Sequence, residues 1–434
     1  MVPSSNFHAP MASRPPSARQ ARRLWAIGDV QALDAHDPLA ARREAFQLPV
    51  GTIYLCGNSL GPMQPGVRAR VQHLIDIEWG VDLIRSWNLH DWFALPERIG
   101  ARLARILGAG ADEVTVADST SVNLFKVACA ARSLRPDRRR ILTERGNFPT
   151  DAYVLQGIAQ MSRGGTEFVA VDRQRISDAI DEDTAVVVLT HVHYKDAAMF
   201  DMAAITARAH AAGALIVWDL SHSVGAVPLA LDACKADFAI GCTYKYLNGG
   251  PGSPAFIYAA RRHHDAMHPG LVGWWGDARP FDFADDFEPA AGMRRMLTGT
   301  GPVIGLLALD AALDLFDDLD MNEVQLKSQC LSSLFFDLIE QKCAGFGLEE
   351  VIPDPPAPRG SHVALRHSEG YAIMQALVRR NVIGDFRAPD IMRFGLTPLY
   401  TSYRDVWNAV DVLAEIMSTG AWQAHEYTLR SRVT

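Results

Sequence analysis

The chain has 434 residues, of which 48% are hydrophobic and 21% are charged, and its formal net charge is -8 at pH 7. This acidic balance argues against the basic face that nucleic-acid binding requires, and no apolar run reaches the roughly 18 residues that a membrane span needs. We therefore expect a globular protein with no nucleic-acid partner and no membrane partner, long enough to form two domains.

Residues 1–23 are rich in Pro, Ser and Arg and contain no acid, which predicts a disordered N-terminal tail. The same bias is found in transit peptides, but the tail lacks the apolar core of a secretory signal. The six cysteines are scattered without a Cys-x-x-Cys pair, at Cys56, Cys129, Cys234, Cys242, Cys330 and Cys343. This pattern predicts reduced thiols in a cytoplasmic protein, and no grouping of His and Cys has the spacing of a metal site.

Between Gly61 and Tyr258, short apolar runs alternate with helical patterns. Seven strands are predicted, at residues 113–117, 140–143, 167–171, 185–189, 214–218, 238–240 and 255–258. A helix over residues 203–212 is stopped by Gly213. Continuous apolar strands separated by helices predict an α/β fold with a mainly parallel sheet that is covered on both faces. We assign residues 61–310 to this large domain.

After about Ala311 the pattern changes to that of a smaller α+β domain, residues 311–434. A helical stretch through residues 334–339 is followed by a proline-rich break at 353–358. Two strands and two helices follow, with strands at residues 362–365 and 391–394 and helices at 372–380 and 406–417.

The most informative part of the chain begins with an apolar run that ends at Asp219. A second apolar run leads to Lys245, 26 residues later, just ahead of a glycine-rich loop. In open α/β sheets, functional groups gather where strands end. There an acid can keep a pyridine nitrogen protonated, and a lysine can form the imine that pyridoxal phosphate requires. Taken alone, each residue also fits a structural role, as a buried strand-end acid or a surface lysine on a turn.

Ser119, Thr120 and Ser121 follow a predicted strand and precede a helical run. Hydroxyl side chains at a helix start are ordinary N-caps. At the carboxyl end of a strand the same arrangement binds phosphate, because free N–H groups and the helix dipole face the anion. His222 also has two interpretations, as a cofactor contact or as a core histidine bonded to the backbone.

Five motifs occur in a fixed order, namely 54–61, 148–151, 219–245, 273–276 and 393–400. Together they closely resemble kynureninase, from about Leu24 to Ala424. The resemblance implies the aspartate aminotransferase fold, which is fold type I of the pyridoxal phosphate enzymes, with residues 24–60 packed on the small domain. It implies hydrolysis of kynurenine to anthranilate and alanine in tryptophan catabolism, and leaves 3-hydroxykynurenine open as a substrate. It also implies a homodimer with shared active sites.

The resemblance assigns roles to individual side chains. Lys245 would carry the cofactor, Asp219 would face the ring nitrogen, and Tyr244 would contact the phosphate and move protons, so these three are the expected catalytic residues. Further cofactor contacts are implied for Thr120, Ser121, Phe148, Asp151, Thr190 and His222, and from the second subunit for Trp274 and Thr300. Substrate contacts are implied for Asn58, Ser59, Trp87 and Arg393, whose guanidinium would bind the α-carboxylate at two points. Trp275 is expected to pack in the core, and Asp277 stands where the family often has histidine.

Two other functions compete with this one. A cysteine desulfurase-like lyase of the same fold needs a reactive cysteine on a mobile loop, and none of the six cysteines lies in a glycine-rich loop of that kind. A non-catalytic regulatory protein that binds pyridoxal phosphate would have no use for the Arg393 clamp. Pyridoxal phosphate-dependent hydrolysis of kynurenine is therefore the function that we expect.

Overall fold

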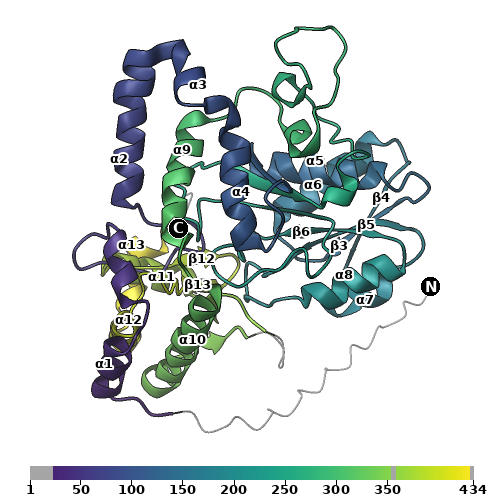
Figure 1. Ribbon diagram of the computed structural model, residues 1–434. Coiled ribbons are helices and arrows are strands. Elements are labelled where there is room, and N and C mark those ends of the chain that lie inside the picture. The colour runs from purple at the N-terminus through teal and green to yellow at the C-terminus, as the bar shows by residue number, and fades with distance from the viewer. Residues whose placement is uncertain (1–22, 353–357, 431–434) are drawn as a thin grey trace, which may run out of the picture.

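The computed structural model describes residues 23–352 and 358–430. Most of the expected N-terminal tail and most of the proline-rich break lie outside the described residues. The described residues form three sheets, with seven, four and two strands, and the two larger ones organise the fold (Figure 1). No helix in the described ranges is long and apolar enough to cross a membrane.

The large sheet is the predicted one. Its strands are β2 (Val114–Ala117), β3 (Arg140–Glu144), β4 (Glu167–Val171), β5 (Thr184–Thr190), β6 (Leu215–Asp219), β7 (Phe238–Gly241) and β8 (Ala255–Ala259). Their spatial order is β2-β8-β7-β6-β5-β3-β4, and every neighbouring pair is parallel except the two that β8 makes. The prediction of a mainly parallel seven-stranded sheet is confirmed.

Helices cover both faces of this sheet, which explains why its central strands are apolar without alternation. On one face, Val187 and Ile216 pack with α4 (Leu95–Leu107) and α8 (Met202–Ala211). On the other face, Val186 and Val217 pack with α5 (Thr120–Ser133) and α6 (Pro149–Met161). Since successive side chains of a strand point to opposite faces, β5 and β6 are fixed from both sides. Their carboxyl ends are consequently held in fixed positions.

The small sheet is antiparallel, in the order β12-β13-β10-β9. Its strands are β9 (Glu349–Glu350), β10 (His362–Arg366), β12 (Asp385–Arg387) and β13 (Ile391–Gly395). The helices α10 (Met321–Cys343), α11 (Gly370–Arg379) and α12 (Tyr403–Thr419) pack with it. Strands β10 and β13 were predicted. Strands β9 and β12 were not, because two or three residues are too few to show a periodicity.

The N-terminal segment makes its contacts with the C-terminal part of the chain. Helix α1 (Ile27–Ala35) lies beside α12, and β1 (Ile53–Tyr54) pairs in parallel with β11 (Val382–Ile383). A buried ion pair joins Asp37 to Lys327 of α10, with 2.6 Å between Oδ2 and Nζ. These contacts support our proposal that residues 24–60 belong with the small domain.

An arm follows this segment and stands out beside α9 (Val303–Ala312) in Figure 1. We use the name arm for residues 65–89, which comprise α2 (Pro65–His73), η2 (Leu74–Asp82), η3 (Leu83–Arg85) and α3 (Ser86–Leu89). Several large apolar side chains of the arm are exposed, namely Ile75, Ile77, Trp79, Val81, Leu83, Ile84 and Leu89. Exposed apolar patches of this kind mark interaction surfaces.

Candidate active site

The carboxyl ends of β5 and β6 bring an acid pair together. Thr190 and Asp219 are register partners at these ends. Asp151, in the first turn of α6, accepts a hydrogen bond at Oδ2 from Thr190 Oγ1 at 3.2 Å. Asp219 Oδ1 accepts one from the Ser221 N–H at 2.8 Å. Both carboxyl groups are buried, with 2% exposure for Asp151 and 4% for Asp219.

Burial determines how this pair ionises. It raises the pKa of Asp219, although hydrogen bonds from Ser221 and the nearby Lys245 charge act against the increase. Burial, followed by the charge of Asp219, raises the pKa of Asp151 well above its usual value. Two carboxylates this close do not both ionise readily. The pair therefore carries one proton, which resides mainly on Asp151, and one negative charge on Asp219.

Lys245 lies on the loop after β7, and its Nζ is 2.9 Å from Nε2 of His222. His222 is 4% exposed, and burial, followed by the Lys245 charge, lowers its pKa well below the usual value. The imidazole is therefore neutral, and Nε2 can accept a hydrogen bond from the amine. The motif of residues 54–61, which we call the early motif, also reaches this loop, because the Gly61 N–H donates to the Tyr244 carbonyl at 2.8 Å. A Cβ at Gly61 would lie 2.4 Å from the Lys245 carbonyl oxygen, so the close approach requires glycine.

A candidate phosphate cradle lies at the start of α5. Ser119 is the N-cap, and its Oγ accepts from the Val122 N–H at 3.4 Å, while Thr120 and Ser121 occupy the first turn and are half-buried. The loop before the helix is held by Asp118, which pairs with the buried Lys126. Strand β8 is also connected to this loop, since the Ala255 N–H donates to the Asp118 carbonyl at 2.9 Å.

This set of side chains fits pyridoxal phosphate. The acid pair offers one negative charge at a buried point, the lysine amine stands beside a neutral histidine, and hydroxyl groups line a helix start. Phe148 immediately precedes α6, is 41% exposed, and meets Tyr194 edge to face at 5.3 Å. It is therefore available to stack on a ring. No group of His, Cys, Asp and Glu placed to hold a metal occurs within residues 23–352 and 358–430.

In the structure, the guanidinium of Arg393 is bound to other groups of the protein. Its side chain is 2% exposed, and its Nε and Nη2 donate to the two carboxylate oxygens of Asp385 at 2.7 and 2.6 Å. Nη2 also donates to Ser59 Oγ at 3.1 Å, and Nη1 donates to the Tyr194 carbonyl. The fork that was expected to bind a substrate carboxylate is therefore bound to Asp385, because a buried guanidinium needs a counter-charge.

Arg387 also belongs to this cluster, and neither Arg387 nor Asp385 was predicted from the sequence. Arg387 donates through Nη2 to Asp385 Oδ2 at 3.0 Å and to Ser59 Oγ at 3.2 Å. Asn58 is fully buried, and neither atom of its side-chain amide has a partner in the described residues. Asp385 is paired with Arg393 in the register of β12 and β13. This strand pairing brings the two side chains together, and nothing local in the sequence identifies Asp385 as the partner of Arg393.

Trp87, Trp274 and Trp275 form an aromatic cluster. Trp87 meets Trp274 and Trp275 at centroid distances of 6.2 and 5.8 Å. Trp275 is 1% exposed, which confirms its core role, whereas Trp274 is 37% exposed and Thr300 is also exposed. Asp277 accepts the Arg279 and Glu288 backbone N–H groups at 2.7 and 2.9 Å and so closes a surface loop.

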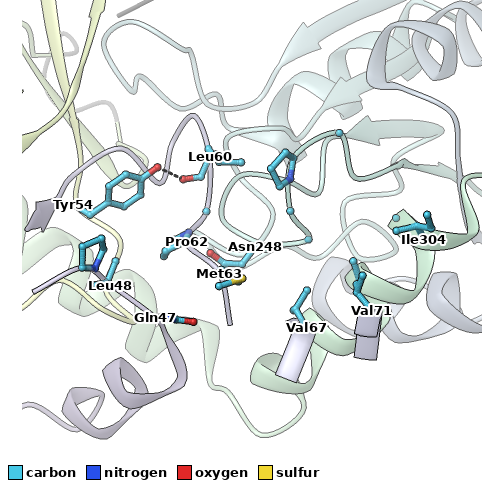
Figure 2. A pocket seen from close by; sticks show the side chains of 18 of the residues that line it. Gln47, Leu48, Tyr54, Leu60, Pro62, Met63, Val67, Val71, Asn248 and Ile304 are labelled. Carbon is cyan, nitrogen blue, oxygen red and sulfur yellow. Dashed lines mark hydrogen bonds between the residues drawn. The ribbon is translucent and has the colours of Figure 1, made fainter. Parts of the chain in front are cut away.

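A cavity of about 660 Å³ is lined in part by the loop that follows Lys245. Its walls come from the early motif, the arm, the glycine-rich loop and α9, and Figure 2 shows Met63, Val67, Val71 and Ile304 around it. Tyr54 donates a hydrogen bond to the Leu60 carbonyl at its edge, at 2.7 Å. None of the candidate cofactor residues lines this largely apolar cavity.

The fold and the site together define the class of this protein, the pyridoxal phosphate-dependent enzymes of fold type I. Solved structures with the same fold include the cysteine desulfurase CsdA from Escherichia coli, with a TM-score of 0.74 and 19% identity over 88% of this chain and 98% of that one. The apo cysteine desulfurase from Thermococcus onnurineus has a TM-score of 0.73 and 15% identity, over 92% of this chain and 100% of that one.

Sequence comparison narrows the class to one family. The kynureninase of Burkholderia mallei is 49% identical over 409 residues, which is 93% of this chain and 98% of the relative. That of Pseudomonas fluorescens is 50% identical over 411 residues, or 94% of this chain and 99% of the relative. Residues 324–413 match the model of the kynureninase C-terminal domain. The chain belongs to the kynureninase family.

Proposed function

We propose that this protein is a pyridoxal phosphate-dependent hydrolase that cleaves kynurenine to anthranilate and alanine. The observation that carries the proposal is the identity of 49 to 50% with kynureninases over at least 93% of the chain. The site supports it, because a buried acid pair and an amine beside a neutral histidine lie at one edge of the large sheet.

The side chains that would hold the cofactor are those at the strand ends. When bound, pyridoxal phosphate supplies an electron sink for negative charge at the α-carbon of the substrate. Asp219 would keep the ring nitrogen protonated, and Asp151 and Thr190 would hold Asp219 in place. Thr120 and Ser121 would hold the phosphate at the start of α5, and Phe148 would lie against the ring.

Lys245 would attach the cofactor and, once released by the substrate amine, would move the proton at the α-carbon. His222 accepts a hydrogen bond from this amine and so orients it. Burial raises the pKa of Tyr244, so its phenol stays protonated at neutral pH. Water adds to the side-chain ketone, and the Cβ–Cγ bond then breaks with its electrons left on Cβ. We assign to Tyr244 the transfer of protons at the ketone oxygen or at Cβ.

The carboxylate of the substrate would bind beside Arg393, in a manner that differs from the two-point clamp inferred from sequence. Asp385, Ser59 and Tyr194 occupy four of the five N–H donors of Arg393, which leaves one for a ligand. The amide of Asn58 has no partner in the described residues and could supply a second donor. We therefore propose a carboxylate site composed of Arg393 and Asn58, with Asp385 holding the guanidinium in place.

The cysteines do not support the competing desulfurase function. Burial raises the pKa of the Cys56 and Cys343 thiols to about 12 and that of Cys129 to about 11, and it also raises those of Cys234 and Cys242. A nucleophilic cysteine needs a lowered pKa. Cys330 is exposed, but it lies on helix α10 and not on a loop. The six free cysteines agree with a cytoplasmic location, which we also propose.

We further propose that the active unit is a homodimer. Trp274, Thr300 and the apolar face of the arm are exposed on one chain, and the apolar cavity of Figure 2 lies where the arm joins the body. A second copy that covers these surfaces would remove them from water. Because Trp87 contacts Trp274, both side chains would reach the active site of the second subunit. There Trp87 would lie against the aromatic end of the substrate.

The direct test is anthranilate fluorescence after kynurenine is added to purified protein loaded with pyridoxal phosphate. We expect anthranilate and alanine in equal amounts. Release of sulfur from cysteine with no turnover of kynurenine would contradict the proposal. A parallel assay with 3-hydroxykynurenine compares kcat/KM for the two substrates.

A further inference from the structure

His362, at the start of β10, is fully buried, and neither of its ring nitrogens has a hydrogen-bond partner in the described residues. The same is true of Nδ1 of His222. Buried polar atoms are nearly always satisfied, so each exception requires an explanation. Here the unpartnered atoms lie on two neighbouring rings, whose centroids are 5.5 Å apart and whose planes are inclined by 55°.

This separation is close to that of a hydrogen-bonded imidazole pair. A ring nitrogen lies about 1 Å from its centroid, and an N–H···N bond is about 2.9 Å long, so two bonded rings have centroids about 5 Å apart. A small rotation of either ring would bring one nitrogen of each within reach. The assignment of His ring orientation is itself inferred from hydrogen bonding.

The other side of His222 fixes the direction of this bond. When the Lys245 amine donates to Nε2 at 2.9 Å, Nε2 must be the acceptor, so the ring proton sits on Nδ1. An N–H group that is buried at this point needs an acceptor. The nearest ring with free acceptor capacity in the described residues is His362.

We propose that His362 is a positioning residue, which accepts a hydrogen bond from Nδ1 of His222 and thereby keeps Nε2 directed at the amine of Lys245. The chain Lys245–His222–His362 would then span from the large sheet to the small sheet. This inference rests on the proposed role of Lys245 as the cofactor lysine.

The surrounding charges favour neutral rings. His222 faces Lys245, Arg393 and Arg387, and His362 faces Arg393 and Arg359 as well as the acids Asp385 and Asp196. Burial and these cations lower the pKa of both imidazoles well below the usual value. The hydrogen bond to His362 would therefore determine which ring nitrogen of His222 carries the proton, while the ring stays neutral.

The test uses the cofactor-loaded protein without substrate. In His362→Leu, which removes the acceptor and retains an apolar side chain, the pH midpoint of the absorption change of the bound cofactor should move by about one unit, a tenfold change in the ionisation constant. His362→Gln, whose amide can accept, should restore at least half of the shift. The matched control is His264→Leu, since His264 is also buried, at 5% exposure, but bonds to the Ala259 carbonyl at 2.8 Å.

An unchanged midpoint in His362→Leu, or an equal shift in the His264→Leu control, would overturn the proposal. If His362→Leu does not fold, ¹⁵N spectra of the histidine rings in the cofactor-free wild-type protein, where Lys245 has a free amine, decide the matter. The proposal requires His222 to carry its proton on Nδ1, and a proton on Nε2 refutes it. Neither measurement involves kynurenine, so failure of the proposed function appears separately, as absence of turnover by the wild type.

Discussion

At the scale of single residues, the acid pair shows that local hydrogen bonds matter more than residue type, since both side chains are almost equally buried. Asp151 and Asp219 have the same side chain, but the first is expected to be protonated and the second charged. This difference arises from the side chain and the backbone N–H of Ser221, whose hydrogen bonds stabilise the charge on Asp219. A single charged acid is what a protonated pyridine ring needs as its partner.

Lys245→Ala should remove the visible absorption of the lysine-linked cofactor and all measurable turnover. No other lysine is placed beside the acid pair in the described part of the chain, so borohydride treatment should trap no cofactor on the variant. The result is read from the absorption spectrum and from mass spectrometry of the treated protein. A trapped adduct on another lysine would show that the attachment site is wrong.

Arg393→Ala should lower kcat/KM for kynurenine on the order of a hundredfold, because a charge-assisted contact to the substrate is lost. Arg393→Lys should recover only part of this loss, since an ammonium cannot reproduce the fork that holds Asp385. Steady-state kinetics measure both values, and the bound cofactor absorption serves as the control for folding. Loss of cofactor with wild-type efficiency after resupply would argue against a carboxylate site.

His191 should make the protein less stable as the medium becomes acidic. Burial lowers its pKa to about 4 from the usual 6.5, so between these values only the unfolded chain binds the proton. The contribution is complete above about pH 6.5 and falls by about 3 kcal/mol by about pH 4. Urea unfolding over this range should show a weaker pH dependence in His191→Gln, and equal curves for the two proteins would contradict the assignment.

At the scale of elements, the sequence predicted those strands that are long and buried. The strands of the large sheet are apolar runs, and all except the half-buried edge strand β4 are almost entirely buried, so their pattern follows from their burial. The cluster of Asp385, Arg387 and Arg393 was not predictable in the same way. It depends on the register between β12 and β13, and a three-residue strand carries no signal that sets a register.

Some of the candidate site residues could likewise be placed from the sequence, and others could not. Thr190 and Asp219 end buried strands and Lys245 follows one, so the sequence was sufficient to bring them to one edge. The orphaned ring of His362 could not be anticipated, because it reaches His222 from the other sheet. Residues that act across two sheets are found only when the packing of those sheets is known.

The buried pair of Asp37 and Lys327 should be a main tie between the N-terminal segment and α10. Asp37→Ala would leave an ammonium buried without a counter-charge, which should cost about 3 kcal/mol of unfolding free energy. The double variant with Lys327→Met should regain most of this loss, because no charge is then buried alone. Denaturant unfolding of the two single variants and the double variant measures the coupling, and additive losses would refute it.

At the scale of the whole molecule, a shared active site predicts complementation between inactive chains. Lys245→Ala and Trp274→Ala should each be inactive, but a mixed dimer has one site with both wild-type residues. Activity should therefore reappear after the two variants are unfolded together and refolded. Mixed dimers that form, as judged by a size tag on one chain, but remain inactive would argue against shared sites.

The antiparallel strand β8 connects the order of folding to the assembly of the site. Residue 114 of β2 pairs with residue 258 of β8, so β2 and the turn that follows it have no place in the sheet until almost the whole large domain has been synthesised. Contacts between segments this far apart form slowly, because a long loop must close first. The hydrogen bond from the Ala255 N–H to the Asp118 carbonyl connects the start of β8, which follows the loop that carries Lys245, to the loop before α5 in the same event. Attachment of pyridoxal phosphate should thus begin only when the sheet is complete, so the appearance of bound cofactor should mark the end of folding.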